Sequence, residues 1–140
     1  MTRVRGRFSG RTFDRGSAHP PIRTLSYRKI RLSARALTVI ERHIERFEDQ
    51  DPMLERAMLA RLQRCLAGHA VPQSVDLRFY SHELREAVRY RLAGYPEGQP
   101  TDPDQQYALW NELHTAALED YRLREGPGVL YAPEVEVLRW

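Results

Sequence analysis

Apolar side chains recur every three or four positions along most of the chain beyond residue 33, and this spacing places them on one face of an α-helix. The first such segment spans about residues 33–48. Ser33 stands where a helix N-cap is expected, because its hydroxyl can accept a hydrogen bond from a free backbone N–H of the first turn. The segment is therefore predicted to be an amphipathic helix. Its apolar face consists of Leu37, Ile40, Ile44 and Phe47.

Three further helices are predicted by the same pattern and by the residues that begin or end them. Pro52 starts the next one, expected over about 52–66, because proline is tolerated at the first helical position. Gly68 and Gly94 stand just beyond expected helix ends, where glycine is common. The remaining two helices are expected over about residues 74–93 and 102–123.

These helices predict a mainly α fold, a single compact domain of about four helices over residues 32–140. Residues 1–31 are expected to form a basic, partly disordered arm or the junction to a carrier, because small residues, proline and arginine dominate its first part. Alternation over residues 24–33 favours one short strand. Beyond a glycine-proline-glycine break, residues 129–140 are expected to form a short extended C-terminal segment.

Charge divides the chain at nearly the same place. Residues 1–31 contain nine basic side chains and one acidic one, whereas residues 32–140 contain thirteen basic and eighteen acidic ones. The net charge of +3 therefore combines a strongly basic arm with an acidic helical part. Such an arm either binds the phosphate groups of a nucleic acid or is a solvated leader, and the sequence leaves both interpretations open.

Several classes of protein are not indicated by the sequence. Cys65 is the only cysteine and lies within a helical pattern, so it is expected in the core and no disulfide is expected. No apolar run of about 18 residues occurs, which predicts no membrane span. The chain also lacks a glycine-rich phosphate loop, a CxxC pair and a GxSxG motif, which argues against P-loop enzymes, zinc ribbons and α/β-hydrolases.

Two of the predicted helices carry a histidine beside carboxylates. His82 and Glu86 are four positions apart and share a helical face, while Glu83 directly follows the histidine. A carboxylate that accepts the proton of one ring nitrogen raises the basicity of the other, which prepares a histidine to act as a general base. His114 lies on the apolar side of the fourth helix, where it is either part of the same site or a core histidine. His43 is expected to be a surface residue.

A metal site is a possible alternative at the same residues. The sequence HELRE at residues 82–86 matches the HExxH motif of zinc peptidases except at its fifth position, where it has Glu86 in place of histidine. With His114 added, two histidines and one carboxylate are present. The favoured interpretation is a site without metal, and no cofactor is assigned from the sequence.

Three ordered segments carry a resemblance to a known group of proteins. They are FYSHELREAVRY (79–90), ALWNELHTAALEDY (108–121) and LYAPEV (130–135). They resemble the (F/Y)-Y-x-H-E-(L/V)-x-E, (T/A)-H-x-x-A-L-x-x-Y and Y-H-P-(D/E) blocks of C-terminal toxin modules of bacterial polymorphic toxins, the tips of Rhs-type, contact-dependent inhibition and type VI effector proteins. The resemblance covers about residues 33–135, and Leu113 stands where the second block has threonine or alanine.

The resemblance implies a toxin used in competition between bacteria. Such a domain is secreted, or delivered by a larger carrier polypeptide, into the cytoplasm of a target bacterium. It is made together with a cognate immunity protein that neutralises it.

Similar sequences have histidine where this chain has Ala132, between Tyr131 and Pro133. Either the chain has drifted, or the histidine was replaced so that a lethal protein could be made without its immunity partner, and the second interpretation is favoured. The chain is then an inactivated toxin, and position 132 marks the catalytic centre together with His82 and His114. Restoring histidine at position 132 is expected to make the chain lethal.

Histidines and glutamates in a small helical domain suit acid–base cleavage of a phosphodiester, so a nuclease acting on RNA or DNA is the favoured function. A metal-dependent hydrolase or peptidase toxin is the first alternative, and a non-enzymatic helical binding or immunity module is the second. The candidate catalytic positions are His82, Glu83, Glu86, His114 and Ala132. The candidate substrate-binding residues are Arg78, Arg85, Arg89, Tyr80 and Tyr131.

Overall fold

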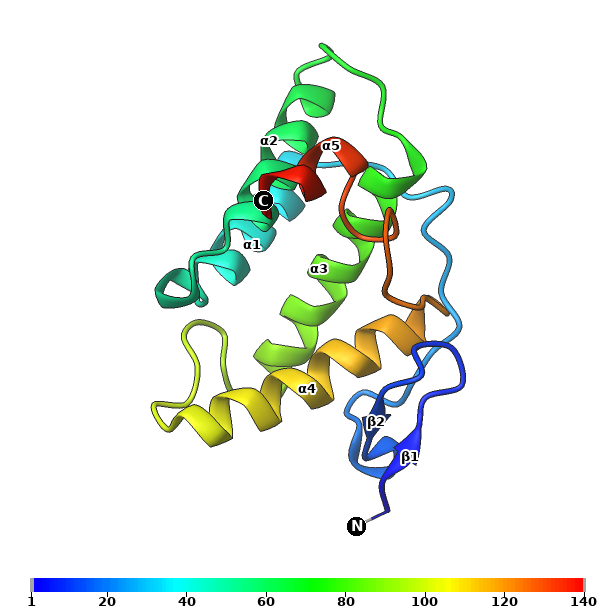
Figure 1. The fold of residues 1–140 in the computed structure, drawn as a ribbon, viewed down its shortest axis with the longest axis vertical. Coiled ribbons are helices and arrows are strands. Elements are labelled where there is room, and N and C mark those ends of the chain that lie inside the picture. The colour runs from blue at the N-terminus through cyan, green and yellow to red at the C-terminus, as the bar shows by residue number, and fades with distance from the viewer. Residues whose placement is uncertain (1, 140) are drawn as a thin grey trace.

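The computed structural model describes residues 2–139 and is mainly helical, which confirms the predicted fold class (Figure 1). No helix in this range is both long and apolar enough to cross a lipid bilayer. The long helices are α1 (Ala34–Glu45), α2 (Met53–Leu66), α3 (Ser74–Leu92) and α4 (Pro103–Asp120), and the short α5 (Pro133–Glu136) follows them.

Capping interactions explain where several of these helices begin. The Ser33 side chain accepts a hydrogen bond from Ala36 N at the start of α1, as the sequence predicts. Asp102 caps α4 by accepting from Gln105 N, and proline occupies the first position of that helix. At the start of α3 a capping box is formed by Gln73 and Asp76.

The central element is α3, which packs against α1, α2 and α4. In Figure 1, α1 and α2 lie side by side on one side of it and α4 crosses its lower half. A hydrophobic core fills the space between α1, α2, α3 and α5, which explains why the middle of α3 is buried on nearly every side. This core consists of Leu37, Ile40, Ile44, Leu54, Met58, Leu59, Leu62, Val75, Phe79, Tyr80, Ala132 and Val135.

The N-terminal arm is folded onto α4, in contrast to the partly disordered arm that the sequence predicts. Strand β1 (Val4–Arg5) pairs antiparallel with β2 (Thr12–Phe13), and the Phe13 side chain is buried. The loop between the strands places the backbone N–H groups of Phe8 and Ser9 on the buried Glu119 carboxylate, at 3.1 and 2.6 Å from Oε2. Arginine-rich composition therefore did not prevent order, because α4 supplies buried acids for this backbone.

One glycine makes the close approach of the arm to α4 possible. A Cβ atom on Gly6 would lie 2.5 Å from Glu119 Oε2, well inside van der Waals contact. The predicted strand over 24–33 is not formed, since this segment runs without a strand partner past the end of α4, where Leu25 N donates to Asp120 O.

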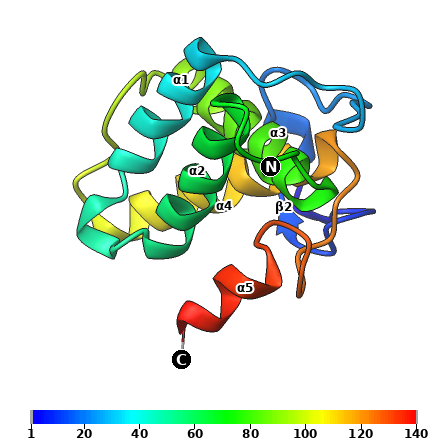
Figure 2. The same ribbon diagram turned by 90° about the horizontal axis from the view of Figure 1, so that it is seen from above.

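The C-terminal segment also differs from the extended conformation that was expected. Residues 133–136 form α5 and residues 137–139 continue it as a 3-10 turn. Pro133 occupies the first turn, where proline does not disturb helical hydrogen bonding, and Ala132 stands at the N-cap position without a side-chain capping bond. Seen from above in Figure 2, α5 projects from one side of the bundle. The preference of valine for extended structure was outweighed here by a proline at a position that starts a helix.

Candidate functional site

Three histidines converge on the carboxylate of Glu86. Its Oε2 atom lies 3.0 Å from His82 Nε2 and 2.9 Å from His114 Nδ1. Its Oε1 atom lies 2.9 Å from His43 Nε2. The glutamate and two of the three imidazoles are wholly buried, and His114 is only 6% exposed. Glu86 is thus the centre of a buried polar cluster in the middle of the helical bundle.

Three helices supply this cluster. His82 and Glu86 are one turn apart on α3, His114 reaches them from α4, and His43 reaches them from the opposite side on α1. The structure thus brings together His82, Glu86 and His114, as the sequence predicts for a single site. The prediction that His43 is a surface residue is wrong, because the ring is 0% exposed and packs edge-on against Phe47 and Tyr90.

The three atoms on the α4 side of Glu86 form a nearly equilateral triangle. His82 Nε2 lies 3.0 Å from His114 Nδ1, and both nitrogens lie equally close to Glu86 Oε2. The corners of such a triangle are too acute for one N–H to donate to both of its neighbours. With Glu86 ionised, every arrangement of the imidazole hydrogens leaves one side of the triangle that joins two donors or two acceptors. Hydrogen bonding alone therefore does not account for this arrangement.

A second group of potential ligand atoms lies on the other side of Glu86. His43 Nε2 is 2.9 Å from Glu86 Oε1 and 3.6 Å from Glu83 Oε2. Within the described part of the chain, His82, Glu86 and His114 form one group of atoms close enough together to hold a metal ion, and His43, Glu83 and Glu86 form another. The two groups share one carboxylate, with one oxygen in each.

The surroundings within the cluster strongly shift the pKa values of its two glutamates. Burial disfavours a charged Glu86, but hydrogen bonds from His114, His43 and His82 outweigh burial and hold its pKa well below the usual range. Glu83 lacks such donors, so burial and the neighbouring Glu86 charge raise its pKa well above the usual range. The pKa values of two glutamates one turn apart are thus shifted in opposite directions, because more imidazoles donate to one of them than to the other.

The pKa values of the two histidines of the triangle are shifted in opposite directions. Burial lowers the pKa of His82, and the hydrogen bond to Glu86 offsets only part of this effect. For His114 burial also acts to lower the pKa, but Glu125 and Glu86 outweigh it and raise the pKa to about 9. His114 Nε2 lies 3.0 Å from Glu125 Oε2, an ion-pair contact that is not aligned as a hydrogen bond. His114 is thus held between two carboxylates.

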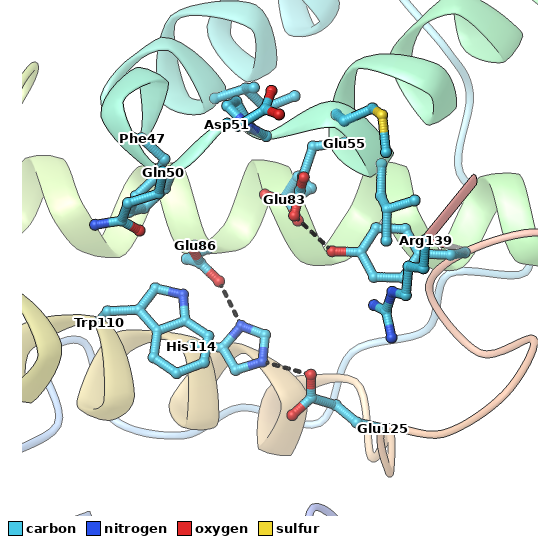
Figure 3. Close-up of a pocket in the computed structure, with 15 residues that line it drawn as sticks. Phe47, Gln50, Asp51, Glu55, Glu83, Glu86, Trp110, His114, Glu125 and Arg139 are labelled. Carbon is cyan, nitrogen blue, oxygen red and sulfur yellow. Dashed lines mark hydrogen bonds and ion pairs between the residues drawn. The ribbon is translucent and has the colours of Figure 1, made fainter. Parts of the chain in front are cut away.

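A cavity of about 490 Å³ opens beside the cluster, between α1, α2, α3 and α4 (Figure 3). Glu83, Glu86 and His114 reach its wall, so the buried cluster is accessible from one side. The Trp110 ring stacks on the His114 ring at 4.4 Å between centroids and forms part of the same wall. The other lining residues are Ile44, Phe47, Gln50, Asp51, Pro52, Met53, Leu54, Glu55, Glu125, Tyr131 and Arg139.

The arginines expected to bind substrate are engaged elsewhere. Arg85 and Arg89 both donate to the buried Asp120 carboxylate, at Nε to Oδ2 distances of 2.9 Å. Arg78 donates to the backbone carbonyls of Val129 and Gly128 and so holds the C-terminal segment. None of these three arginines lines the cavity. Arg85 and Arg89 lie three positions after His82 and Glu86 and share their α4-facing side of α3, but their guanidinium groups are taken up there by Asp120.

Of the tyrosine and alanine candidates, one lines the cavity and two lie in the hydrophobic core. Tyr131 lines the cavity and its hydroxyl donates to Glu55 Oε1 at 2.8 Å. The Tyr80 hydroxyl instead bonds to Arg31 O, far along the chain, and its ring lies in the core. Ala132 is also fully buried in that core, with its N–H 3.4 Å from Met58 Sδ, and does not line the cavity.

Sequence reasoning missed three members of this site: His43, Glu125 and Glu55. A signal for the first was present, because His43 lies three positions after Ile40 and four before Phe47 on the apolar face of α1. No comparable signal existed for the two glutamates, whose positions depend on how distant segments meet.

Comparison with known proteins adds no relative to this description. No protein-family model matches the chain, no curated protein matches it, and no solved structure matches its fold.

Proposed function

We propose that the chain is a metal-dependent hydrolase whose divalent ion is held by His82 Nε2, His114 Nδ1 and Glu86 Oε2. The observation that carries the proposal is the triangle of these atoms, with sides of 2.9–3.0 Å. Ligand bonds to zinc are about 2.0–2.2 Å, so the ligands of one tetrahedral ion lie roughly 3–3.5 Å apart. Two imidazoles and one carboxylate also form a ligand set typical of catalytic ions, which keep a position open for water.

The surroundings of the triangle support the same function. Histidine ligands usually direct their other ring nitrogen towards a carboxylate, which fixes the ring and its tautomer, and Glu125 lies in that position beside His114 Nε2. Trp110 stacks on the same ring and limits its rotation. An ion at the triangle would polarise a bound water molecule and a substrate oxygen. The cavity, which Glu125 and Tyr131 also line, gives such a substrate access to the triangle.

Acid–base catalysis without metal, which the sequence favours, receives less support. That mechanism requires two proton-transferring groups on opposite sides of the reacting group, and the histidines of the cluster were the main candidates for them. His43 and His82 are wholly buried behind Glu86, and only His114 reaches the cavity wall. A single accessible imidazole supplies one of the two proton transfers.

Metal binding tests this proposal directly and does not require an active chain. Titration of the metal-free protein with Zn²⁺ or Mn²⁺, followed by calorimetry, is expected to show binding. His114→Ala is expected to weaken the affinity at this site by more than the about 10–100-fold that loss of an outer partner causes. His69→Ala is the matched control, because His69 is exposed in the loop after α2. Absence of binding, or equal affinity in both variants, would contradict the proposal.

The biological setting that we propose is that of an interbacterial toxin, supported by the three sequence blocks that resemble polymorphic-toxin modules. In this setting the partners are a cognate immunity protein and a carrier polypeptide that delivers the domain into a target bacterium. Expression of Ala132→His in a bacterial cytoplasm is expected to arrest growth, whereas the parent chain is tolerated. Because position 132 is fully buried, the thermal unfolding of the variant is measured in parallel. Normal growth of cells that contain the folded variant contradicts the toxin setting.

A further inference from the structure

We propose that Glu86 bridges two divalent ions, the second held by His43 Nε2, Glu86 Oε1 and Glu83 Oε2, and that this pair receives a phosphate ester. The inference rests on the proposed function, because it adds a second ion to the site at His82 and His114.

The geometry of the second group parallels that of the first. His43 Nε2 is 2.9 Å from Glu86 Oε1 and 3.6 Å from Glu83 Oε2, which spans the separations expected of ligands to one ion. The two oxygens of Glu86 serve different groups, Oε1 facing His43 and Oε2 facing His82 and His114. A carboxylate shared in this way holds paired ions about 3.5–4 Å apart in two-metal hydrolases.

Burial and charge give a second, independent reason for a cation on this side. Glu83 is 7% exposed and Glu86 is 2% exposed, and they lie one turn apart on α3. Within residues 2–139 neither forms an ion pair with an arginine or a lysine. The nearby Arg46 is directed to the carbonyls of Tyr95 and Gly98 instead. Buried carboxylates are normally paired with cations or bound to metal, and an ion beside His43 would supply Glu83 with the positive charge that no arginine or lysine of the described residues provides.

His43 is fixed in the position that a ligand requires. Its ring contacts the rings of Phe47 and Tyr90 edge-on, at centroid distances of 5.4 and 5.2 Å, which directs Nε2 towards the carboxylates. Its Nδ1 atom has no hydrogen-bond partner among the described residues. A buried imidazole whose one satisfied nitrogen faces two carboxylates is placed for coordination more than for packing.

The charge of the cavity indicates the class of substrate. Five acidic residues line it, at positions 51, 55, 83, 86 and 125, and Arg139 is the one arginine among the lining residues. Without added cations this wall repels an anion. Two divalent ions would offset most of this negative charge and leave vacant coordination positions that suit the oxygens of a phosphate ester. Phosphatases and nucleases use such ion pairs on a negatively charged substrate, so the phosphate ester is the substrate that the double site favours.

The reaction that we infer is hydrolysis of a phosphodiester. The oxygen of water forms a bond to phosphorus while the bond from phosphorus to the leaving oxygen breaks. One water proton ends on the leaving alcohol, and the other is released from the new phosphomonoester to solvent. The bridged ions would contact the attacking and leaving oxygens on opposite sides of the phosphorus atom. This chemistry is that of a nuclease, the function that the sequence favours.

Titration of the full chain with Mn²⁺, read by electron paramagnetic resonance, tests the second ion. We expect two equivalents to bind and to give the signal of a magnetically coupled pair. His43→Gln is expected to bind one equivalent and to give the signal of isolated Mn²⁺. Glutamine retains much of the volume of histidine, and circular dichroism of each protein verifies that it is folded. His69→Gln is the matched control and should bind two equivalents, because His69 is exposed.

The failures of the two proposals are distinguishable in this experiment. One equivalent in both the parent chain and His43→Gln overturns the second site and leaves the hydrolase proposal in place, whereas no bound Mn²⁺ overturns both. Inorganic phosphate tests the substrate class. It is expected to alter the coupled signal of the parent chain at millimolar concentration, and an unchanged signal overturns the assignment to phosphate esters.

Discussion

Replacing Glu86 by glutamine is expected to remove metal binding at both proposed positions, with a loss of affinity of at least about 100-fold. Each oxygen of the carboxylate lies 2.9–3.0 Å from imidazole nitrogens on its own side, so one substitution affects two groups of ligand atoms. Glutamine has the same shape but lacks the charge, and its amide nitrogen cannot coordinate an ion. The measurement is metal content after dialysis against a defined concentration of Mn²⁺.

The matched control for this prediction is Glu97→Gln, which removes the same charge from an exposed position in the loop between α3 and α4. It should leave metal content unchanged. Retention of both ions by Glu86→Gln would show that the carboxylate is only a hydrogen-bond acceptor for the three histidines. The contrast also separates a local effect on the cluster from an effect of net charge on cation binding.

The helices were predictable because their causes are local. Apolar spacing and the side chains at Ser33 and Asp102 define where α1 and α4 begin, and the structure shows both caps formed. The end of α4 was less predictable. The helix stops at Asp120, before the predicted residue 123, and Arg122 adopts the left-handed conformation with φ of 54°. Rules that look for glycine at helix ends do not anticipate an arginine there.

The site was predictable where the pattern of a single helix marks its members. His82, Glu83 and Glu86 follow from the spacing on α3, and His114 was found because it stands among apolar residues. The contribution of α1 was missed, since its histidine was considered without the apolar face on which it lies. Glu125 comes after the end of α4, and its contact with His114 depends on a turn that the sequence pattern does not specify.

The arginines were predicted at the site, but the structure places them elsewhere, and this too could not be read from the sequence. Arg85 and Arg89 stand near His82 in the sequence, and this proximity suggested contacts to a phosphate. By helical spacing they also share its face, and the structure shows both the histidine and the arginines directed towards α4. The arginines are nevertheless engaged by Asp120, a buried acid that the sequence alone does not identify as a partner.

Replacing Asp120 by asparagine is therefore expected to destabilise the fold by about 3–5 kcal/mol, because it leaves a buried guanidinium without its counter-charge. Arg89 and Asp120 are both 0% exposed, and the arginine contacts both carboxylate oxygens, with Nε 2.9 Å from Oδ2 and Nη2 3.0 Å from Oδ1. Oδ1 also accepts the backbone N–H of Arg23 at 2.8 Å, so the same change loosens the N-terminal arm. Chemical denaturation followed by circular dichroism measures the free energy of unfolding.

The control for this prediction is Asp104→Asn, which makes the same substitution at an exposed position in the first turn of α4. It is expected to change the free energy of unfolding by less than about 1 kcal/mol, the range of an exposed charge near a helix end. An Asp120→Asn protein as stable as this control would mean that Arg85 and Arg89 do not depend on the carboxylate. The assignment of Asp120 as the counter-charge that holds these arginines in the core would then be wrong.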